Sequence, residues 1–273
     1  MNYLILVSSG QIGNHLTSYL ENKGHVVKTL DISNGIDEDV SEYSVFNENT
    51  VKGIDFVYFL AFDVGGARYL NAYQDTFNFI HNNISILKNV FKVLSETKTP
   101  FIFTSTQMSS LSYSSYGVTK RIGEIYTKTL NGLCVRLWNV YGIEHDLTKS
   151  HVITDFILKA HNNRLIDSLT SGEEYRQFLH AEDCCNALYI LSQNYHEIDR
   201  EKNLHISSFV WTSVADIAKL ISKYIPCKIT FAQNVDTVQF NSKIEPDPYI
   251  LTMWRPTINI DDGIKQMVDY YVS

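Results

Sequence analysis

The sequence predicts an α/β protein built on a doubly wound parallel sheet, with a smaller domain after it. Three observations support this prediction. Short apolar runs alternate with amphipathic stretches over the first half of the chain, the runs are continuously apolar, and the alternation becomes irregular after Gly142. Continuously apolar runs are typical of parallel strands covered on both faces, and strand–helix alternation is typical of a doubly wound sheet.

Five apolar runs are candidate strands, at residues 3–7, 26–30, 56–60, 101–104 and 134–137. Ile12, Leu16 and Leu20 repeat at an interval of four, which predicts a helix after the first strand. Apolar residues from Phe77 to Leu94 follow the same three-and-four spacing and predict a second, longer helix. These elements make up the predicted sheet and the helices that connect its strands.

The chain is expected to divide near Gly142. Residues 1–142 would form the nucleotide-binding domain, with parts of 176–210 returning to it, and residues 143–273 would form a smaller, discontinuous domain for substrate. Helices are expected at 156–162, 183–192 and 213–224, and a polar loop at 234–248. A chain of 273 residues with 44% hydrophobic content can bury one large core and a satellite core.

Composition excludes several classes of function. The formal net charge of -7 disfavours nucleic acid as a partner. The first residues lack the pattern of a signal peptide, and no apolar run approaches the ~18 residues of a membrane span, so we expect no signal peptide and a cytoplasmic location. The histidines lack metal-ligand spacing, and the cysteines lack CxxC spacing. We therefore expect no metal and four reduced thiols, at Cys134, Cys184, Cys185 and Cys227.

The first strand leads into a glycine-containing turn, where Gly10 and Gly13 flank Gln11 and Ile12. Glycine lets a pyrophosphate approach the backbone and the N-terminus of the following helix, where unpaired N–H groups favour negative charge. Asp31 follows the second strand, where its carboxylate can accept hydrogen bonds from the adenosine ribose and repel a 2′-phosphate. The pattern predicts NAD rather than NADP as cofactor, in a Rossmann-type domain.

Val7 departs from this pattern, because a three-glycine fingerprint would place its first glycine there. A β-branched residue is costly in a left-handed turn. Either the turn follows another path or cofactor binding is weaker. Two glycines alone are also consistent with an ordinary strand–helix turn.

Catalytic side chains are expected after the strand at 101–104. Thr106 lies at its carboxyl end, and Tyr116 and Lys120 lie one helical turn apart on a common face. An ammonium group beside a phenol would lower the pKa of Tyr116 toward neutrality, and Thr106 could donate to the same substrate oxygen. The alternative is that Tyr116 and Lys120 form an exposed helical pair.

Several motifs in order resemble the NAD-dependent epimerase/dehydratase family, the extended short-chain dehydrogenases. The resemblance covers nearly the whole chain and carries the fold and chemistry of that family as expectations. The matching stretches are Leu60-Ala61-Phe62, Val64-Gly65-Gly66, Asn83, the YxxxK pair, RLWNVYG at 136–142, GEEYRQFLHAED at 172–183, Trp254-Arg255-Pro256 and Asp262-Gly263-Ile264.

The resemblance implies a role for each matched residue. Thr106, Tyr116 and Lys120 would be catalytic, and Tyr116 and Lys120 would also contact the cofactor. Asn139 and Arg176 would hold the diphosphate of a nucleotide-activated sugar, a geometry that suits a guanidinium and an amide. The cofactor would further be lined by Asp39, Val40, Leu60, Ala61 and Phe62.

Other matched residues have structural interpretations. Arg176 could instead form a surface ion pair with Glu173 or Glu174. His180 and Asp183 are expected to close a turn and cap the next helix, and Tyr141 is expected to pack. The family also implies a homodimer through two helices per subunit, here in the regions 78–95 and 116–130, although both helices could simply face their own sheet.

The residues after Thr106 limit which reactions of the family this chain could catalyse. Dehydratases of the family have an Asp–Glu pair there, whereas this chain has Gln107 and Met108. GDP-fucose synthase-like members use a Cys and a His and normally NADPH, but no cysteine follows Thr106 and Asp31 disfavours that cofactor. We therefore expect hydride abstraction at a ring carbon, with 4-epimerisation first. The alternatives are a net dehydrogenase or 4-keto reductase, and a non-catalytic NAD-binding regulator.

Two segments are shorter than the family usually has: the segment from Asp31 to Asp39 and the loop from Thr106 to Tyr116. The second loop normally covers the sugar. We therefore expect a more open site, or a site covered by another segment such as residues 64–73.

Overall fold

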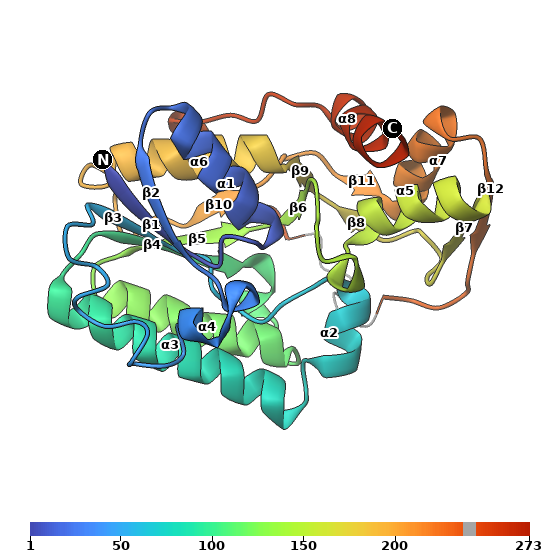
Figure 1. The fold of residues 1–273 in the computed structure, drawn as a ribbon. Helices are drawn as coiled ribbons and strands as arrows, with labels where there is room; N and C mark the ends of the chain where they lie inside the picture. Colours follow the sequence, from blue (N-terminus) through green and yellow to red (C-terminus); the bar gives the residue numbers. More distant parts are fainter. Residues whose placement is uncertain (237–243) are drawn as a thin grey trace.

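The computed structural model describes residues 1–236 and 244–273, and its centre is a parallel sheet of six strands (Figure 1). The strand order is β10-β5-β4-β3-β1-β2, and each neighbouring pair is parallel. The bounds are β1 Asn2–Leu6, β2 Val26–Leu30, β3 Phe56–Phe59, β4 Phe101–Thr106, β5 Leu133–Leu137 and β10 Leu204–Ile206. The predicted doubly wound α/β fold is confirmed.

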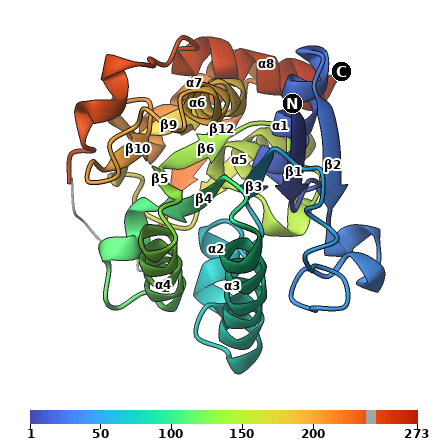
Figure 2. The same cartoon turned by 90° about the vertical axis from the view of Figure 1, so that its left-hand side faces the viewer.

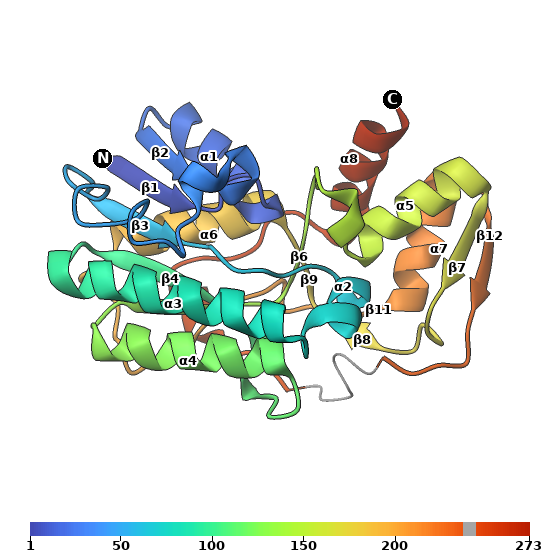
Figure 3. The same cartoon turned by 60° about the horizontal axis from the view of Figure 1, so that its bottom comes forward.

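Helices cover both faces of this sheet (Figures 1 and 2). The helices α1 (Gln11–Asn22) and α6 (Ala181–Gln193) pack on one face, and α3 (Phe77–Thr97) and α4 (Ser115–Thr129) lie side by side on the other (Figure 3). Each face has its own apolar core, centred on residues such as Leu16 and Leu188 on the first face and Phe59 and Phe91 on the second. Burial of both faces explains why the strands are continuously apolar.

The strand ends differ slightly from the prediction, and Val7 is the informative case. β1 ends at Leu6, and Val7 has a φ of 69° while its N–H donates to Leu30 O at 2.7 Å. The chain therefore keeps a left-handed turn with a valine in it, so of the two alternatives the one of a different path is wrong. A backbone hydrogen bond to β2 and contacts with the apolar core hold this unfavourable conformation.

The short segment after β2 contains two 3₁₀ turns, η1 (Ile32–Asn34) and η2 (Ile36–Glu38), and no strand before β3. β2 is consequently an edge strand. Its burial is lower than the apolar pattern predicted, and Val26 is exposed. This arrangement leaves the carboxyl end of β2, with Asp31, beside the turn that follows β1.

The other described residues form three two-stranded sheets and a third apolar core. The strand pairs are β6 (Asn139–Tyr141) with β9 (Phe178–His180), β7 (Leu165–Ser168) with β12 (Lys228–Phe231), and β8 (Tyr175–Arg176) with β11 (Thr212–Ser213). The helices are α2 (Ala67–Tyr73), α5 (Val152–Asn163), α7 (Val214–Tyr224) and α8 (Ile260–Val272), and the 3₁₀ turns are η3 (Gln107–Ser110), η4 (Leu147–Lys149) and η5 (Pro248–Thr252).

The three helices predicted in this part of the chain are α5, α6 and α7. The predicted loop at 234–248 includes residues 237–243, which lie outside the described residues, and its last residue, Pro248, begins η5. Because α6 packs on α1 and β10 pairs with β5, we propose two domains with a boundary near residue 142 and a return of the later chain to the first domain. Within the described residues, every helix is too short or too polar to cross a bilayer.

Candidate active site

A cavity of about 1510 Å³ opens at the carboxyl end of the sheet and extends toward α5 and α7. Its lining runs from Asp31 at one end, past Thr106 and Tyr116, to Arg176 at the other. Open α/β sheets bind ligands at this edge, and a pocket for one drug-sized ligand usually measures roughly 300–1,000 Å³. The cavity is therefore large enough for two ligands that meet near Tyr116.

The first end of the cavity is the turn that leads into α1. Gly10 is the N-cap of α1 and brings no side chain that could bond the first amides of the helix. A Cβ on Gly13 would lie 2.1 Å from Val7 O, so only glycine permits this close approach of helix and strand. Gln11 and Ile12 also line the cavity. The first turn of α1 can thus receive a pyrophosphate, and the residues fit an adenine dinucleotide.

Asp31 lies buried in the cavity wall at the carboxyl end of β2. One carboxylate oxygen accepts from Ser9 N at 2.7 Å and Ser9 Oγ at 2.5 Å, and the other accepts from Ser33 N at 2.9 Å and Ser33 Oγ at 2.8 Å. Burial alone would raise the pKa of Asp31, but these hydrogen bonds hold it below its ordinary value. The carboxylate is therefore a fixed negative charge at the expected ribose site.

The sequence analysis missed a second carboxylate here, that of Glu38. Its Oε2 accepts from Asp31 N at 2.7 Å and from Asn34 Nδ2 at 2.9 Å, and the side chain lines the cavity. Asp39 and Val40 line it as well, and Val40 O accepts from Asn89 Nδ2 at 2.8 Å. The acidic residues Asp31, Glu38 and Asp39 all line this end of the cavity, and their negative charges would repel an additional phosphate. Glu38 and Asp39 were visible in the sequence as part of the acidic run Asp37-Glu38-Asp39.

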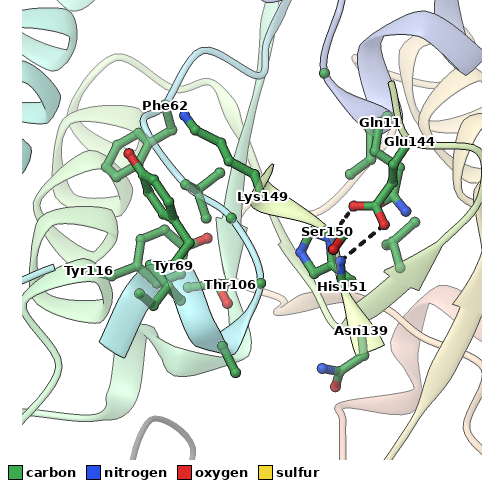
Figure 4. Close-up of a pocket in the computed structure, with 18 of the residues that line it drawn as sticks. Gln11, Phe62, Tyr69, Thr106, Tyr116, Asn139, Glu144, Lys149, Ser150 and His151 are labelled. Atoms are coloured by element: carbon green, nitrogen blue, oxygen red, sulfur yellow. Dashed lines mark hydrogen bonds and ion pairs between the residues drawn. The ribbon is translucent and has the colours of Figure 1, made fainter. Parts of the chain in front are cut away.

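The predicted catalytic residues meet at the middle of the cavity. Thr106 ends β4 and Tyr116 lies in the first turn of α4, and a hydrogen bond links their side chains. Figure 4 shows both on one wall of the cavity, together with Phe62. Burial raises the pKa of Tyr116 above its ordinary value, and the hydrogen bond with Thr106 opposes this only in part. The predicted lowering of the Tyr116 pKa is therefore wrong for this structure.

The reason is the position of Lys120. Its Nζ donates to Thr104 O at 2.7 Å and lies 3.8 Å from the centre of the Phe62 ring, so Lys120 is directed at the sheet and at Phe62. Burial lowers the pKa of Lys120 to about 7, although Cys134 and Glu124 act in the opposite direction. Tyr116 is 8% exposed and Lys120 is 3% exposed, so the alternative of an exposed helical pair is also wrong.

Glu124 extends the same face of α4 by one turn and is a further residue that the sequence analysis missed. Its carboxylate accepts from Ser105 Oγ on β4 at 2.7 Å, from Arg136 Nε on β5 at 2.8 Å, and from Arg121 NH1 at 2.7 Å. The i, i+4 spacing from Lys120 could have indicated it. Glu124 therefore fastens the helix that carries Tyr116 to the strand that carries Thr106.

On the opposite wall, Asn139 begins β6 and faces the cavity (Figure 4). Its Oδ1 accepts from Gln107 Nε2 at 3.2 Å. Gln107 Oε1 is buried and has no hydrogen-bond partner among the described residues. The amide pair thus presents an acceptor beside Thr106.

Arg176, on β8, lines the far end of the cavity and is 8% exposed. It forms an ion pair with Asp236 and donates to Tyr175 O at 2.7 Å. Within the described residues, the carboxylate that pairs with Arg176 is that of Asp236 and not that of Glu173 or Glu174. A guanidinium at this depth can bind phosphate oxygens at the end of the cavity away from Asp31.

Opposite Tyr116, a Glu–His pair lines the cavity (Figure 4), and the sequence analysis missed it too. His151 is the N-cap of α5; its N–H donates to Glu144 Oε2 at 3.0 Å and its Nδ1 lies 2.5 Å from Glu144 Oε1. Burial would raise the pKa of Glu144, but the bonds from His151 and Thr154 keep it below its ordinary value. A carboxylate that holds Nδ1 leaves Nε2 for proton exchange.

Residues 64–71, which follow β3 and belong to the segment proposed to cover the site, line the cavity. Asn83 fixes the backbone of Asp63, accepting from its N–H at 2.7 Å and donating to its O at 3.2 Å. The Asp63 carboxylate then binds Tyr69 of α2 at 2.7 Å and Lys149 of η4 at 3.0 Å. Leu60 and Phe62 line the cavity, whereas Ala61 is buried in the core and does not.

The residues given a structural interpretation behave accordingly. His180 is the N-cap of α6 and accepts from Glu182 N. Asp183 accepts from the N–H groups of Thr257 and Ile258 at 2.9 and 2.8 Å, and so ties α6 to the segment before α8. Tyr141 packs at 5.2 Å against the ring of His180.

Comparison with known proteins identifies the family. The model of the NAD-dependent epimerase/dehydratase family matches residues 4–207, which is most of the chain. The chain belongs to this family. It is therefore an enzyme of the extended short-chain dehydrogenase type with NAD as its cofactor, as the turn before α1 and Asp31 predicted.

Individual relatives are distant. A GDP-L-fucose synthase from Sinorhizobium fredii is 27% identical over half of this chain, a match that spans 45% of that protein. A UDP-glucuronic acid decarboxylase 1 from Xenopus tropicalis is 20% identical, with 98% of this chain and 71% of that protein covered.

Among solved structures, a UDP-glucose 4-epimerase from Thermotoga maritima has a TM-score of 0.83 at 19% identity, with 100% of this chain and 99% of that chain covered. A GDP-6-OMe-4-keto-L-xylo-heptose reductase from C. jejuni has a TM-score of 0.84 at 16% identity, with 99% and 97% covered. At these identities the structural matches establish the fold alone.

Proposed function

We propose that this member of the epimerase/dehydratase family interconverts nucleotide-activated sugars by hydride abstraction at a ring carbon, in the first place as a 4-epimerase. The main observation that supports this proposal is one continuous cavity that runs from Asp31 to Arg176, with Thr106 and Tyr116 between them. A cofactor on one side and a nucleotide sugar on the other would bring the sugar to Tyr116. One of the structural relatives is a UDP-glucose 4-epimerase, and this supports the choice.

Bound NAD supplies the hydride acceptor and donor. The chain would hold it with the first turn of α1 from Gly10 to Gly13, with Asp31 at the ribose, and with Asp39, Val40, Leu60 and Phe62 along the wall. Because the acidic end disfavours a 2′-phosphate, NAD is preferred over NADP.

Tyr116 would transfer the proton of the sugar hydroxyl group. Its phenol oxygen exchanges a proton with the sugar hydroxyl, and the Thr106 hydroxyl donates to the same oxygen. Lys120 contributes positive charge or a hydrogen bond to the cofactor ribose. Asn139 and Arg176 hold the diphosphate, which fixes the sugar in the cavity.

The test starts from protein purified without added nucleotide. After denaturation, near-stoichiometric NAD in the supernatant is expected for a cofactor kept through each turnover. The protein is then incubated with UDP-glucose, UDP-galactose and GDP-mannose, and the products are separated by chromatography. Formation of the 4-epimer without NADH supports the proposal. Accumulation or consumption of NADH would favour a dehydrogenase or 4-keto reductase, and failure to bind NAD or any nucleotide sugar would contradict the proposal.

A second candidate rests on the Glu144–His151 pair, which faces Tyr116 across the cavity. On a nucleotide-linked sugar that already carries a keto group, such a pair can remove a proton from the neighbouring carbon and return one to the opposite face, which is epimerisation with no hydride transfer. Incubation in D₂O separates the two reactions. A hydride returned to the same carbon brings in no solvent deuterium, whereas proton exchange at carbon does, and that incorporation should disappear in His151→Asn.

We also propose a homodimer through α3 and α4. Their outer surfaces carry exposed apolar side chains, among them Phe77 and Ile84 on α3 and Val118 and Ile125 on α4. The inner faces of the same helices pack on the sheet, so a second apolar face remains for a second copy. The helices are adjacent, which would give a four-helix contact between two copies (Figure 3).

A further inference from the structure

Two amide side chains meet where the neighbouring strands β4 and β5 end. Thr106 is paired with Leu137 in the last register of these strands, and Gln107 and Asn139 follow one and two residues beyond this pair. Gln107 Nε2 donates to Asn139 Oδ1 at 3.2 Å, and both side chains line the cavity. Gln107 occupies the position at which dehydratases of the family have an acid, but an amide cannot replace an acid in proton transfer. Its available contribution is therefore hydrogen bonding.

The backbone of Gln107 is held on both sides. The turn η3 begins at Gln107 with Thr106 as its N-cap, and Gln107 O accepts from Ser110 Oγ at 3.2 Å. A Cβ on Gly117 of α4 would lie 2.2 Å from Met108 O, so α4 packs closely against this turn. The fold therefore fixes the point from which the Gln107 side chain reaches Asn139.

The direction of the hydrogen bond decides which end of the Asn139 amide is left for a ligand. An amide has an acceptor oxygen at one end and a donor NH₂ group at the other, and a half-turn about the last side-chain bond exchanges them. Because Gln107 engages Oδ1, Asn139 Nδ2 is left for other partners, and among the described residues it donates to none. Asn139 itself points into the cavity (Figure 4).

Burial favours this direction over the reverse one. Gln107 Oε1 is buried and has no hydrogen-bond partner among the described residues. If both amides turned, Asn139 Nδ2 would donate to Gln107 Oε1, and Gln107 Nε2 would become the buried group without a partner. Buried N–H groups without a partner are rarer in proteins than buried oxygens without one, because they are costlier. The fold thus keeps the Asn139 oxygen on Gln107 and its NH₂ group free.

We propose that Gln107 is a positioning residue for Asn139: it holds the oxygen end of the Asn139 amide, so that the NH₂ end faces the diphosphate of the nucleotide sugar. A diphosphate only accepts hydrogen bonds, so it is bound by Nδ2 and repelled by Oδ1. This inference rests on the proposed function, because it takes the diphosphate as the ligand of Asn139. Gln107 acts through Asn139 and needs no contact with the ligand.

The test is a double-mutant cycle on the affinity for UDP and for GDP, measured by titration calorimetry. It compares the wild type, Gln107→Glu, Asn139→Ala and the double variant. A glutamate offers only oxygens at neutral pH, so Asn139 Nδ2 turns to it and Oδ1 then faces the diphosphate. We expect Gln107→Glu to weaken binding about tenfold or more, because an acceptor replaces an oriented donor and a charge is added. In the Asn139→Ala background the same change should weaken binding about threefold or less at about 0.5 M salt, where the added charge is largely screened.

Gln107→Met is the second variant and adds no charge. It frees the Asn139 amide, so the fraction of protein with Nδ2 toward the ligand falls to about half and binding weakens about twofold. This loss should disappear in the Asn139→Ala background. Gln266→Met makes the same exchange at an exposed position of α8 outside the cavity lining and should bind like the wild type. The melting temperature and the NAD affinity should stay close to the wild-type values in every variant, which separates positioning from a general loss of structure.

Equal losses in the two backgrounds would overturn the inference, because Gln107 would then act on the ligand without Asn139. Wild-type affinity in Gln107→Glu would overturn it as well. A wild type that binds NAD but neither UDP nor GDP would instead contradict the proposed nucleotide-sugar substrate, and the inference would fail with it.

Discussion

At the scale of single residues, the position of Tyr116 depends mainly on its ring and only a little on its hydroxyl group. The hydroxyl bonds Thr106, and the ring is held by its neighbours, Phe62 among them. Removal of the oxygen should therefore leave the fold intact while it removes the proton donor. This separates chemistry from stability more cleanly than a change at Lys120, whose side chain is bonded to the sheet.

Tyr116→Phe should lower turnover of any sugar substrate by about 100-fold or more, which is the usual contribution of a general acid or base. NAD binding and the melting temperature should stay close to those of the wild type. Tyr126→Phe on the same helix is the control, because Tyr126 is exposed and lies outside the cavity. A Tyr116→Phe protein with wild-type turnover would remove this tyrosine from the mechanism.

Asp31→Ala should shift the cofactor preference. It removes a carboxylate that is held toward the ribose site by Ser9 and Ser33, so NAD should bind about 10-fold or more weakly, while NADP loses a source of repulsion. Titration of both cofactors gives the ratio of the two dissociation constants. Asp37→Ala, in the same loop but outside the cavity lining, should leave that ratio unchanged. An unaltered ratio in Asp31→Ala would argue against the ribose assignment.

At the scale of elements, the relation between α4 and the ends of β4 and β5 decides the geometry of the site. Glu124 links these three elements, because its carboxylate accepts hydrogen bonds from Ser105 on β4, Arg136 on β5 and Arg121 on α4 itself. Burial raises the pKa of Glu124, but the hydrogen bonds from Arg136 and Ser105 outweigh it and lower the pKa to about 2.

The lowered pKa gives a prediction for acid stability. A carboxyl group whose pKa is lower in the folded than in the unfolded chain stabilises the fold above its ordinary value of 4.5, and this stabilisation is lost as the pH falls from there toward about 2. Glu124→Gln should cost about 2–3 kcal/mol of unfolding free energy at neutral pH, because it leaves the arginine half-paired. Urea unfolding should show this difference shrinking between pH 4.5 and 2. A difference that is constant with pH would show that the carboxylate charge does not matter.

Elements also show where sequence patterns are informative. The strands and main helices were predictable because buried faces impose apolar periodicity, and Gly13 was predictable because a backbone contact excludes a side chain. The pairing of Glu144 with His151 and of Arg176 with Asp236 was not, since these partners meet only through tertiary packing. The raised pKa of Tyr116 was missed for the same reason: helical spacing placed Lys120 one turn away, but it could not show how deeply tertiary packing buries the phenol.

At the scale of the whole molecule, the outer faces of α3 and α4 are the surface through which we propose that two copies of the chain form a dimer. Ile125 is 59% exposed on α4, so a charge there should not disturb the monomer. Ile125→Glu should convert the proposed dimer to a monomer in light scattering coupled to size-exclusion chromatography. Val26→Glu places the same charge on the exposed edge of β2 and should remain dimeric. A wild-type protein that elutes as a monomer would refute the dimer.

The hydroxyl of Tyr271, in the last turn of α8, donates to Glu144 O at 3.0 Å and accepts from Glu144 N at 2.8 Å. Tyr271, near the end of the given sequence, thus holds the loop that aligns His151, whereas Gly10 of the cofactor site lies near its beginning. A fragment trimmed to the span of the family model, residues 4–207, would retain Thr106, Tyr116 and Lys120 but lose this prop. Such a shortened protein could be used to measure cofactor binding, but its catalytic activity would not represent that of the whole chain.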